Sequence, residues 1–143
     1  MEYPDAQFLN ADEIQREAGP QTHPVEAGRE LLLRLEACVQ SQSSFVLETT
    51  LASTAHARKI VRWSGLGYRV ILHFIEVPSV DFALARVARR VALGGHDVPE
   101  MDVRRRFSRG IRHFGETYKP IVDEWYHWRS DDKGLSLIDD GPR

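Results

Sequence analysis

The feature that most constrains the fold is an apolar run from Tyr68 to Val77, in which hydrophobic residues occupy both faces of any strand it would form. This pattern is typical of a central parallel strand that helices cover on both sides. The run ends at Pro78-Ser79, a pair that stops a strand and caps a following helix. We therefore predict a central parallel strand here, and we expect His73 inside it to be a sheet-face or core residue.

The segments on either side of this run extend the same strand and helix alternation. Alternation of this kind indicates the α/β class, with a parallel sheet flanked by helices. We expect strands at 7–9, 45–47, 68–77 and 135–138, and helices that begin near Asn10, Pro24, Ser53, Ser79 and Pro99, with one more that carries Trp125 and Trp128.

Composition limits the functional classes. The 143 residues are enough for one domain, 1–143, with a hydrophobic core. A net charge of -2 argues against a general nucleic-acid binder. Cys38 is the only cysteine and falls on a buried helix stripe, so we expect neither a disulfide nor a cysteine metal site. The sequence shows no signal peptide and no membrane-spanning run, so we expect a cytoplasmic location and no membrane partner.

Polar residues follow two of the predicted strands directly. Glu48, Thr49 and Thr50 come after the strand at 45–47, and open α/β sheets bind ligands at the carboxyl ends of their strands. These three residues are therefore candidates for substrate contacts, although a strand end with a capping threonine explains them equally well. Asp12 follows the first strand in the same way, and both a helix cap and a functional carboxylate fit its position.

An arginine-rich subregion, 86–112, spans two predicted helices that Gly94-Gly95 joins. Arginine binds phosphate through two parallel hydrogen bonds, and a cluster on a mobile element can bring positive charge to a phosphoryl group. The alternative is a solvated basic face that balances the acidic remainder of the chain. We interpret the subregion as a phosphate-binding lid.

Five segments, in order along the chain, resemble the zeta-toxin-like P-loop kinases. They are Phe8 to Ile14, Phe45 to Thr50, Gly67 to Val70, Arg86 to Pro99 and Arg104 to Phe107. The resemblance implies a P-loop kinase-like three-layer architecture that uses ATP and Mg²⁺. It also implies phosphate transfer to a hydroxyl of a sugar nucleotide such as UDP-N-acetylglucosamine, with an antitoxin as a protein partner.

The resemblance further implies roles for individual residues, which fall into a catalytic and a substrate-binding group. The implied catalytic residues are Asp12, as the general base for the acceptor hydroxyl, and three arginines that contact phosphate, Arg86, Arg90 and Arg105. The implied substrate-binding residues are Glu48, Thr49 and Thr50.

The chain departs from the family where ATP would bind. No G-x-x-x-x-G-K-[ST] phosphate loop occurs, and only nine residues precede Asn10. The backbone cradle, the phosphate lysine and the Mg²⁺-binding hydroxyl of that motif are therefore missing from this chain, and cofactor-binding residues stay unknown. We expect an N-terminally truncated, incomplete domain without the phosphate-loop strand, which is inactive alone. Near the end, Arg129-Ser130 stands where the family often has Asp-Asn.

Non-catalytic functions remain as alternatives. The chain is then a remnant that binds a nucleotide sugar or an anion, or that pairs with a complementing chain through open strands. An unpaired buried backbone group costs about 1–3 kcal/mol, so strands that lack a neighbour favour such a partner. A nucleic-acid binder is the least favoured alternative, because aromatic residues do not alternate with the arginines. No metal site is predicted.

Overall fold

The computed structural model describes residues 3–19, 21 and 23–142. The chain divides into two compact units, residues 1–49 and residues 50–143, which we call unit 1 and unit 2. Within the described residues, no helix is both long and apolar enough to span a membrane. Each unit is mixed α/β, with a small sheet and flanking helices, as the sequence predicts at this level.

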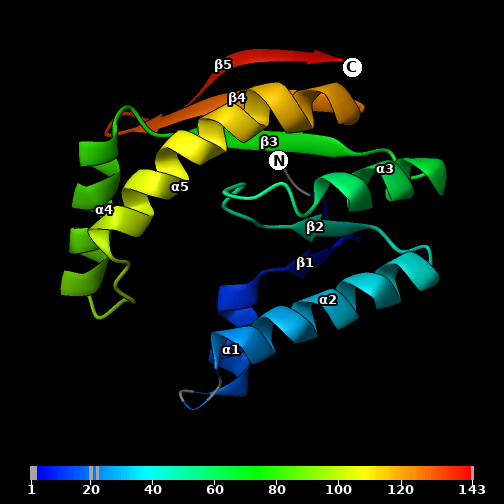
Figure 1. Ribbon diagram of the computed structural model, residues 1–143, viewed down its shortest axis with the longest axis horizontal. Helices are drawn as coiled ribbons and strands as arrows, with labels where there is room; N and C mark the ends of the chain where they lie inside the picture. The colour runs from blue at the N-terminus through cyan, green and yellow to red at the C-terminus, as the bar shows by residue number, and fades with distance from the viewer. Residues whose placement is uncertain (1–2, 20, 22, 143) are drawn as a thin grey trace. The chain divides into compact units, whose positions relative to one another are not determined.

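Unit 1 consists of two parallel strands and two helices. Strand β1 (Gln7–Leu9) pairs with β2 (Phe45–Leu47), and α1 (Ala11–Ala18) and α2 (Pro24–Gln40) follow β1 along the chain (Figure 1). Helix α2 starts at the predicted proline, and a reciprocal capping box between His23 and Glu26 fixes its first turn. The core of unit 1 gathers the most buried apolar side chains, namely Leu9, Ile14, Ala27, Leu35, Cys38 and Val39.

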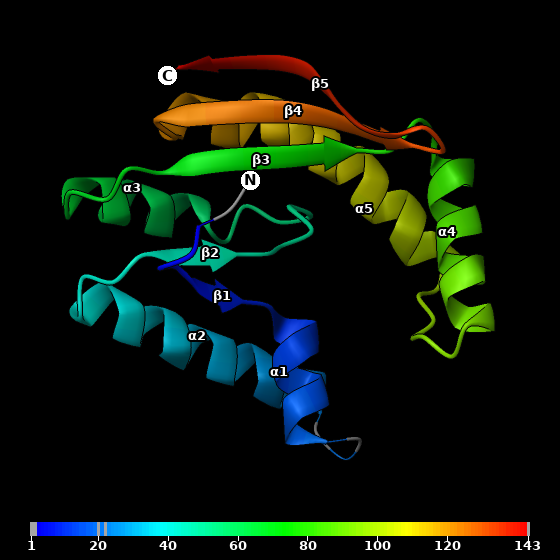
Figure 2. The same ribbon diagram turned by 180° about the vertical axis from the view of Figure 1, so that it is seen from behind.

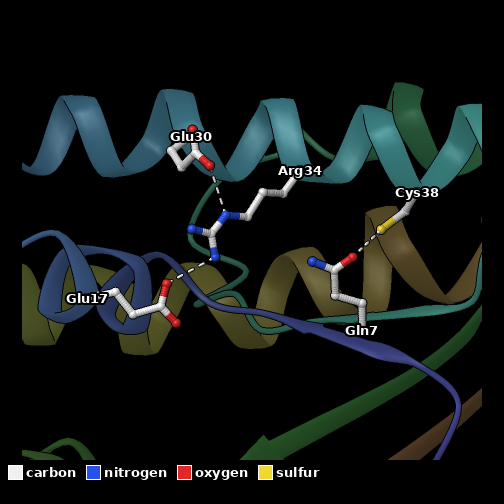
Figure 3. A network of polar contacts seen from close by, with 5 residues as sticks. All are labelled: Gln7, Glu17, Glu30, Arg34 and Cys38. Atoms are coloured by element: carbon white, nitrogen blue, oxygen red, sulfur yellow. Dashed lines mark hydrogen bonds and ion pairs between the residues drawn. The ribbon is translucent and has the colours of Figure 1, made fainter.

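Polar contacts tie the elements of unit 1 together, as Figure 3 shows. Arg34 on α2 donates to Glu30 at 2.9 Å and to Glu17 on α1 at 3.1 Å. The buried Cys38 thiol donates to the side-chain oxygen of Gln7 at 3.0 Å, and burial raises the pKa of this thiol. A protonated, buried thiol is a poor nucleophile, which agrees with the inert packing expected for Cys38.

Unit 2 is built on a three-stranded sheet in the order β3-β4-β5. Strands β3 and β4 are parallel, whereas β5 runs antiparallel to β4. Helix α5 crosses one face of this sheet in both views (Figures 1 and 2). The elements are α3 (Ala57–Gly65), β3 (Ile71–Glu76), α4 (Val80–Ala92), α5 (Glu100–His113), a π-helical turn η1 (Phe114–Tyr118), a 3-10 turn η2 (Lys119–Ile121), β4 (Glu124–Asp131) and β5 (Gly134–Pro142).

The core of unit 2 lies between the sheet and the end of α5. Phe114, only 4% exposed, stacks on Phe74 of β3 with ring centroids 4.5 Å apart. It also meets Trp125 and His127 of β4 edge to face, at 6.0 and 5.1 Å. Aromatic pairs in these geometries add to the stabilisation that burial provides. The α5 side of the sheet is therefore a packed aromatic layer.

The opposite face of the sheet is less covered. Register pairs Ile75 with Trp128 and Trp128 with Leu137, which places one row of apolar side chains across three strands. Ile75 is 56% exposed and Leu137 is 47% exposed. We call this row, together with the neighbouring His73 and Tyr126, the open face.

Two sequence predictions need correction. The helix expected to carry Trp125 and Trp128 is wrong, because both residues lie in strand β4. Aromatic residues favour strands, and here parallel pairing with β3 outweighs the helical spacing that links this segment to the preceding turns. The run at 68–77 does form a strand, β3, but β4 is its only partner among the described residues, so β3 is an edge strand rather than a central one.

Candidate functional site

In unit 1, polar side chains meet where β1 and β2 end. The two strands are parallel and end in register at Leu9 and Leu47. The next residues therefore emerge side by side, and the backbone N–H of Glu48 donates to the carbonyl of Leu9 at 3.0 Å. The Asn10 side-chain amide donates to the Glu48 carboxylate at 2.7 Å. Asn10 and Glu48 thus form a polar pair at the edge of the sheet where α/β proteins bind ligands.

Asn10, not Asp12, caps the first helix. Its side-chain oxygen accepts from the backbone N–H of Asp12 at 2.8 Å, so Asn10 is the N-cap of α1. The carboxylate of Asp12 is exposed in the first turn and makes no ion pair with another described residue. A carboxylate that neither caps its helix nor pairs with a cation is available for a ligand.

Thr49 and Thr50 fall on the two sides of the division between the units. Thr49 ends unit 1 and Thr50 begins unit 2, and both residues are exposed. Thr50 belongs to a loop that is held firmly within unit 2. Its carbonyl lies close to Gly110 of α5, where an added Cβ would approach the oxygen to 3.6 Å.

The loop after Thr50 is strained and anchored. Leu51 is buried with a φ of 52°, a left-handed conformation that costs a branched residue free energy. The His113 ring nitrogen Nδ1 lies 2.8 Å from the Leu51 carbonyl and donates to it. The Tyr118 hydroxyl donates to the Ser53 carbonyl at 2.7 Å, and burial raises the pKa of Tyr118. Backbone strain that neighbours maintain in this way is often found beside binding sites.

The arginine-rich subregion 86–112 consists of α4, the segment after it and α5. Arg86 donates to the Ser130 hydroxyl at 2.9 Å and lies over the Phe82 ring at 4.8 Å. Ser130 is one of the two residues at which the chain departs from the resembled family. Arg90 is exposed in the last turn of α4 and forms no ion pair with a described residue. Both arginines therefore keep guanidinium donors open to solvent.

Three consecutive arginines on α5 have different surroundings. Arg104 pairs with Glu100 at 2.7 Å, and Arg105 pairs with Asp102 at 2.6 Å. Arg106 makes no ion pair within the described part of the chain. Its side chain lines a hollow of about 110 Å³ at the carboxyl end of β3. The sequence singles out Arg105, whereas Arg106 is the arginine that lies in a concave site.

The same hollow contains a second residue that the sequence did not single out. Glu76, the last residue of β3, lines it together with Thr50. The Glu76 carboxylate lies 2.7 Å from the His127 ring nitrogen Nε2, and both side chains are 20% exposed. Glu76 could have been identified from the sequence, because it is a polar residue at the end of an apolar strand, as Glu48 is.

The predicted site residues are thus distributed over both units. Unit 1 holds Asp12, Glu48 and Thr49, and brings the first two to one edge with Asn10. Unit 2 holds the remaining predicted residues, which are Thr50, Arg86, Arg90 and Arg105.

The residues present do not fit ATP with Mg²⁺. The chain has no phosphate loop. Within the described ranges, no group of three or more histidine, cysteine or acidic side chains is arranged to hold a metal ion.

Comparison with known proteins finds a similar sequence but assigns neither a family nor a function to the chain. No family model matches the chain, and no solved structure matches it. The chain is similar to a protein of Haemophilus influenzae described as uncharacterized, with 26% identity over 102 residues. The similarity covers 69% of this chain and 73% of that protein. It indicates a related sequence in another protein and carries no information about activity.

Proposed function

We propose that the chain is the acceptor-binding and lid part of a zeta-toxin-like phosphotransferase, with a sugar nucleotide such as UDP-N-acetylglucosamine as the phosphate acceptor. The observation that carries the proposal is the Asn10–Glu48 pair at 2.7 Å, with Asp12 unpaired in the same unit. The P-loop kinase-like three-layer architecture and a cytoplasmic location belong to this proposal.

The proposed roles follow from the chemistry of each side chain. Glu48 accepts a hydrogen bond from an acceptor hydroxyl, and Asn10 orients the Glu48 carboxylate. Asp12 takes the proton from the hydroxyl that receives phosphate. On α4, Arg86 and Arg90 bind phosphate oxygens, for which guanidinium groups are well suited.

ATP chemistry lies outside this chain in the proposal. We expect the chain alone to show no ATP hydrolysis and no phosphate transfer, because it lacks the phosphate-loop motif. A sensitive phosphate-release assay on the purified chain is the test. Hydrolysis that disappears in Asp12→Ala or Arg90→Ala would contradict the proposal, since the chain would then supply its own ATP site.

A second candidate function is the binding of a complementing protein chain, such as an antitoxin or a strand donor. The supporting observation is the second edge of β3, which pairs with no other strand of unit 2 among the described residues and has no proline, bulge or central charge to block pairing. The other edge of the sheet, on β5, carries Asp139, Asp140 and Pro142 and a register shift, features that discourage pairing.

Self-association of the chain alone tests this second candidate. An unprotected edge beside an apolar face pairs with whatever strand is available, so we expect concentration-dependent association in the micromolar to millimolar range. The substitution Ile75→Lys on the open face should suppress association without lowering the urea midpoint, because Ile75 is already 56% exposed. A chain that stays monomeric in light scattering over that range would count against this function.

A further inference from the structure

The hollow at the end of β3 combines apolar walls with a few polar groups that converge on it. Phe74, Phe107 and Ile111 form apolar walls, and the polar groups are Thr50, Glu76 and Arg106. Small-molecule sites likewise combine apolar walls with a few polar groups, but they are usually larger, so this hollow suits only a ligand of a few heavy atoms. All of these residues lie in unit 2, so the hollow is formed by unit 2 alone.

Two charged residues, Arg106 and Glu76, line the hollow and differ from their neighbours in having unpaired polar atoms among the described residues. Arg106 is unpaired among the described residues, whereas its two neighbours Arg104 and Arg105 are neutralised by acidic residues on their own helix. Glu76 is held on one oxygen by His127, and its other oxygen has no hydrogen-bond partner within the described chain. The residues that line the hollow therefore include one arginine without an ion pair and one glutamate with a carboxylate oxygen that has no partner among the described residues.

The polar groups are also fixed before any ligand arrives. His113 and Tyr118 anchor the strained loop that carries Thr50, and the backbone of this loop packs against Gly110. His127 holds Glu76 in the same way. Groups that are ordered in the free protein lose less conformational entropy on binding, which favours affinity for a small ligand.

We propose that this hollow binds a small 2-hydroxy acid. Its carboxylate pairs with the Arg106 guanidinium, and its hydroxyl donates to the free oxygen of Glu76 and accepts from the Thr50 hydroxyl. The hollow has a volume of about 110 Å³, which gives room for a molecule of a few heavy atoms. A phosphate dianion fits less well, because Glu76 repels its second negative charge.

The test is a set of NMR titrations of the intact chain with glycolate, acetate and ethylene glycol. Glycolate carries both groups, acetate lacks the hydroxyl and ethylene glycol lacks the charge. We expect glycolate to shift the amides of Thr50 to Ser53 and of Glu76 with a millimolar dissociation constant, and to bind about tenfold more tightly than either analogue.

Matched variants separate the site from general charge effects. Arg106→Gln should weaken glycolate binding about tenfold or more, whereas Arg105→Gln should not change it, because Arg105 is occupied by Asp102. Glu76→Gln should reduce the preference for glycolate over acetate. Equal binding of glycolate and acetate, equal binding by Arg106→Gln and the unchanged protein, or no shift at these amides would overturn the proposal.

The inference goes beyond the proposed phosphotransferase and does not depend on it. Glycolate is not a sugar nucleotide, and the variants Arg106→Gln and Glu76→Gln leave Asn10, Asp12 and Glu48 intact. If the chain binds glycolate but not UDP-N-acetylglucosamine, the glycolate site is supported and the proposed phosphotransferase function is contradicted. If it binds UDP-N-acetylglucosamine but not glycolate, the proposed function is supported and the glycolate site is contradicted.

Discussion

Replacement of Asn10 by Asp tests whether the Asn10–Glu48 hydrogen bond stabilises unit 1. Aspartate keeps the side-chain oxygen that caps α1 at the Asp12 N–H, so the cap itself survives. The substitution removes the amide that donates to Glu48 and sets two carboxylates against each other. The perturbation is therefore confined to the pair.

The expected loss has two parts. A lost exposed hydrogen bond costs about 0.5–1.5 kcal/mol. Two like charges at about 4 Å in water repel by about 1 kcal/mol. We expect Asn10→Asp to destabilise unit 1 by about 2 kcal/mol at neutral pH, and Asn10→Ser, which keeps the cap without adding charge, by about half as much.

Amide hydrogen exchange is the appropriate assay, because it reports each unit separately. Exchange of the α1 and α2 amides should accelerate roughly 30-fold in Asn10→Asp and roughly 5-fold in Asn10→Ser, the factors that about 2 and about 1 kcal/mol correspond to. Tryptophan fluorescence serves as the control, because Trp63, Trp125 and Trp128 all belong to unit 2.

A destabilisation that is the same for Asn10→Asp and Asn10→Ser at every pH would refute this reasoning. It would mean that Glu48 does not face residue 10 in solution. Unchanged α1 exchange in both variants would refute it as well, because neither the hydrogen bond nor the repulsion would then be present.

Further outcomes follow from other parts of unit 2. Burial lowers the pKa of His56 and His73. The free energy of unfolding should therefore be greatest above about pH 6.5, the ordinary histidine pKa, and should fall as the pH drops below it; urea midpoints that do not change with acid would contradict this. Phe114→Ala should cost about 3–5 kcal/mol in urea unfolding, because it empties the aromatic layer beside Phe74, and a loss under 1 kcal/mol would show that the layer is not packed. Gly95→Ala should cost about 1–3 kcal/mol in the same assay, since its Cβ would come within 2.5 Å of the Arg90 Cγ and 2.9 Å of the Arg90 carbonyl, and an unchanged midpoint would exclude that close approach.

Local signals in the sequence predict three helix starts of this chain correctly, whereas the helix expected near Ser53 begins later, at Ala57. Pro24, Ser79 and Asn10 mark helix starts because each supplies a fixed φ or a capping oxygen at a backbone position that needs one. These interactions span only a few residues, so they are visible without the fold. Strands at 7–9 and 45–47 are likewise readable from short apolar runs.

Pairing partners could not be predicted in the same way. The apolar run that forms β3 indicates which faces are buried but not which strands lie beside it, because neighbours in a sheet are distant in sequence. For the same reason the sequence of β4 predicts a helix. Trp125 and Trp128 are three residues apart, which suits a helix turn, and only the pairing of this segment with β3 shows that they lie on opposite faces of a strand.

The candidate site was predictable in part. The carboxylates after two strands, Asp12 and Glu48, lie at one edge in unit 1, because parallel strands end together. The resemblance implies Arg105, and it does not single out Arg106. Arg106 shares its face of α5 with the buried Val103 and Gly110. This spacing is visible in the sequence, but it indicates that Arg106 faces the sheet only once α5 is known to pack there.

Titration calorimetry of the purified chain with UDP-N-acetylglucosamine measures whether the ends of β1 and β2 hold a phosphate acceptor. The account predicts saturable binding without ATP, weakened about tenfold or more in Glu48→Gln and unchanged in Glu116→Gln, an exposed carboxylate of unit 2 that serves as the matched control. Absence of binding by the unchanged chain, or equal binding by Glu48→Gln, would contradict the claim that the ends of β1 and β2 hold a phosphate acceptor.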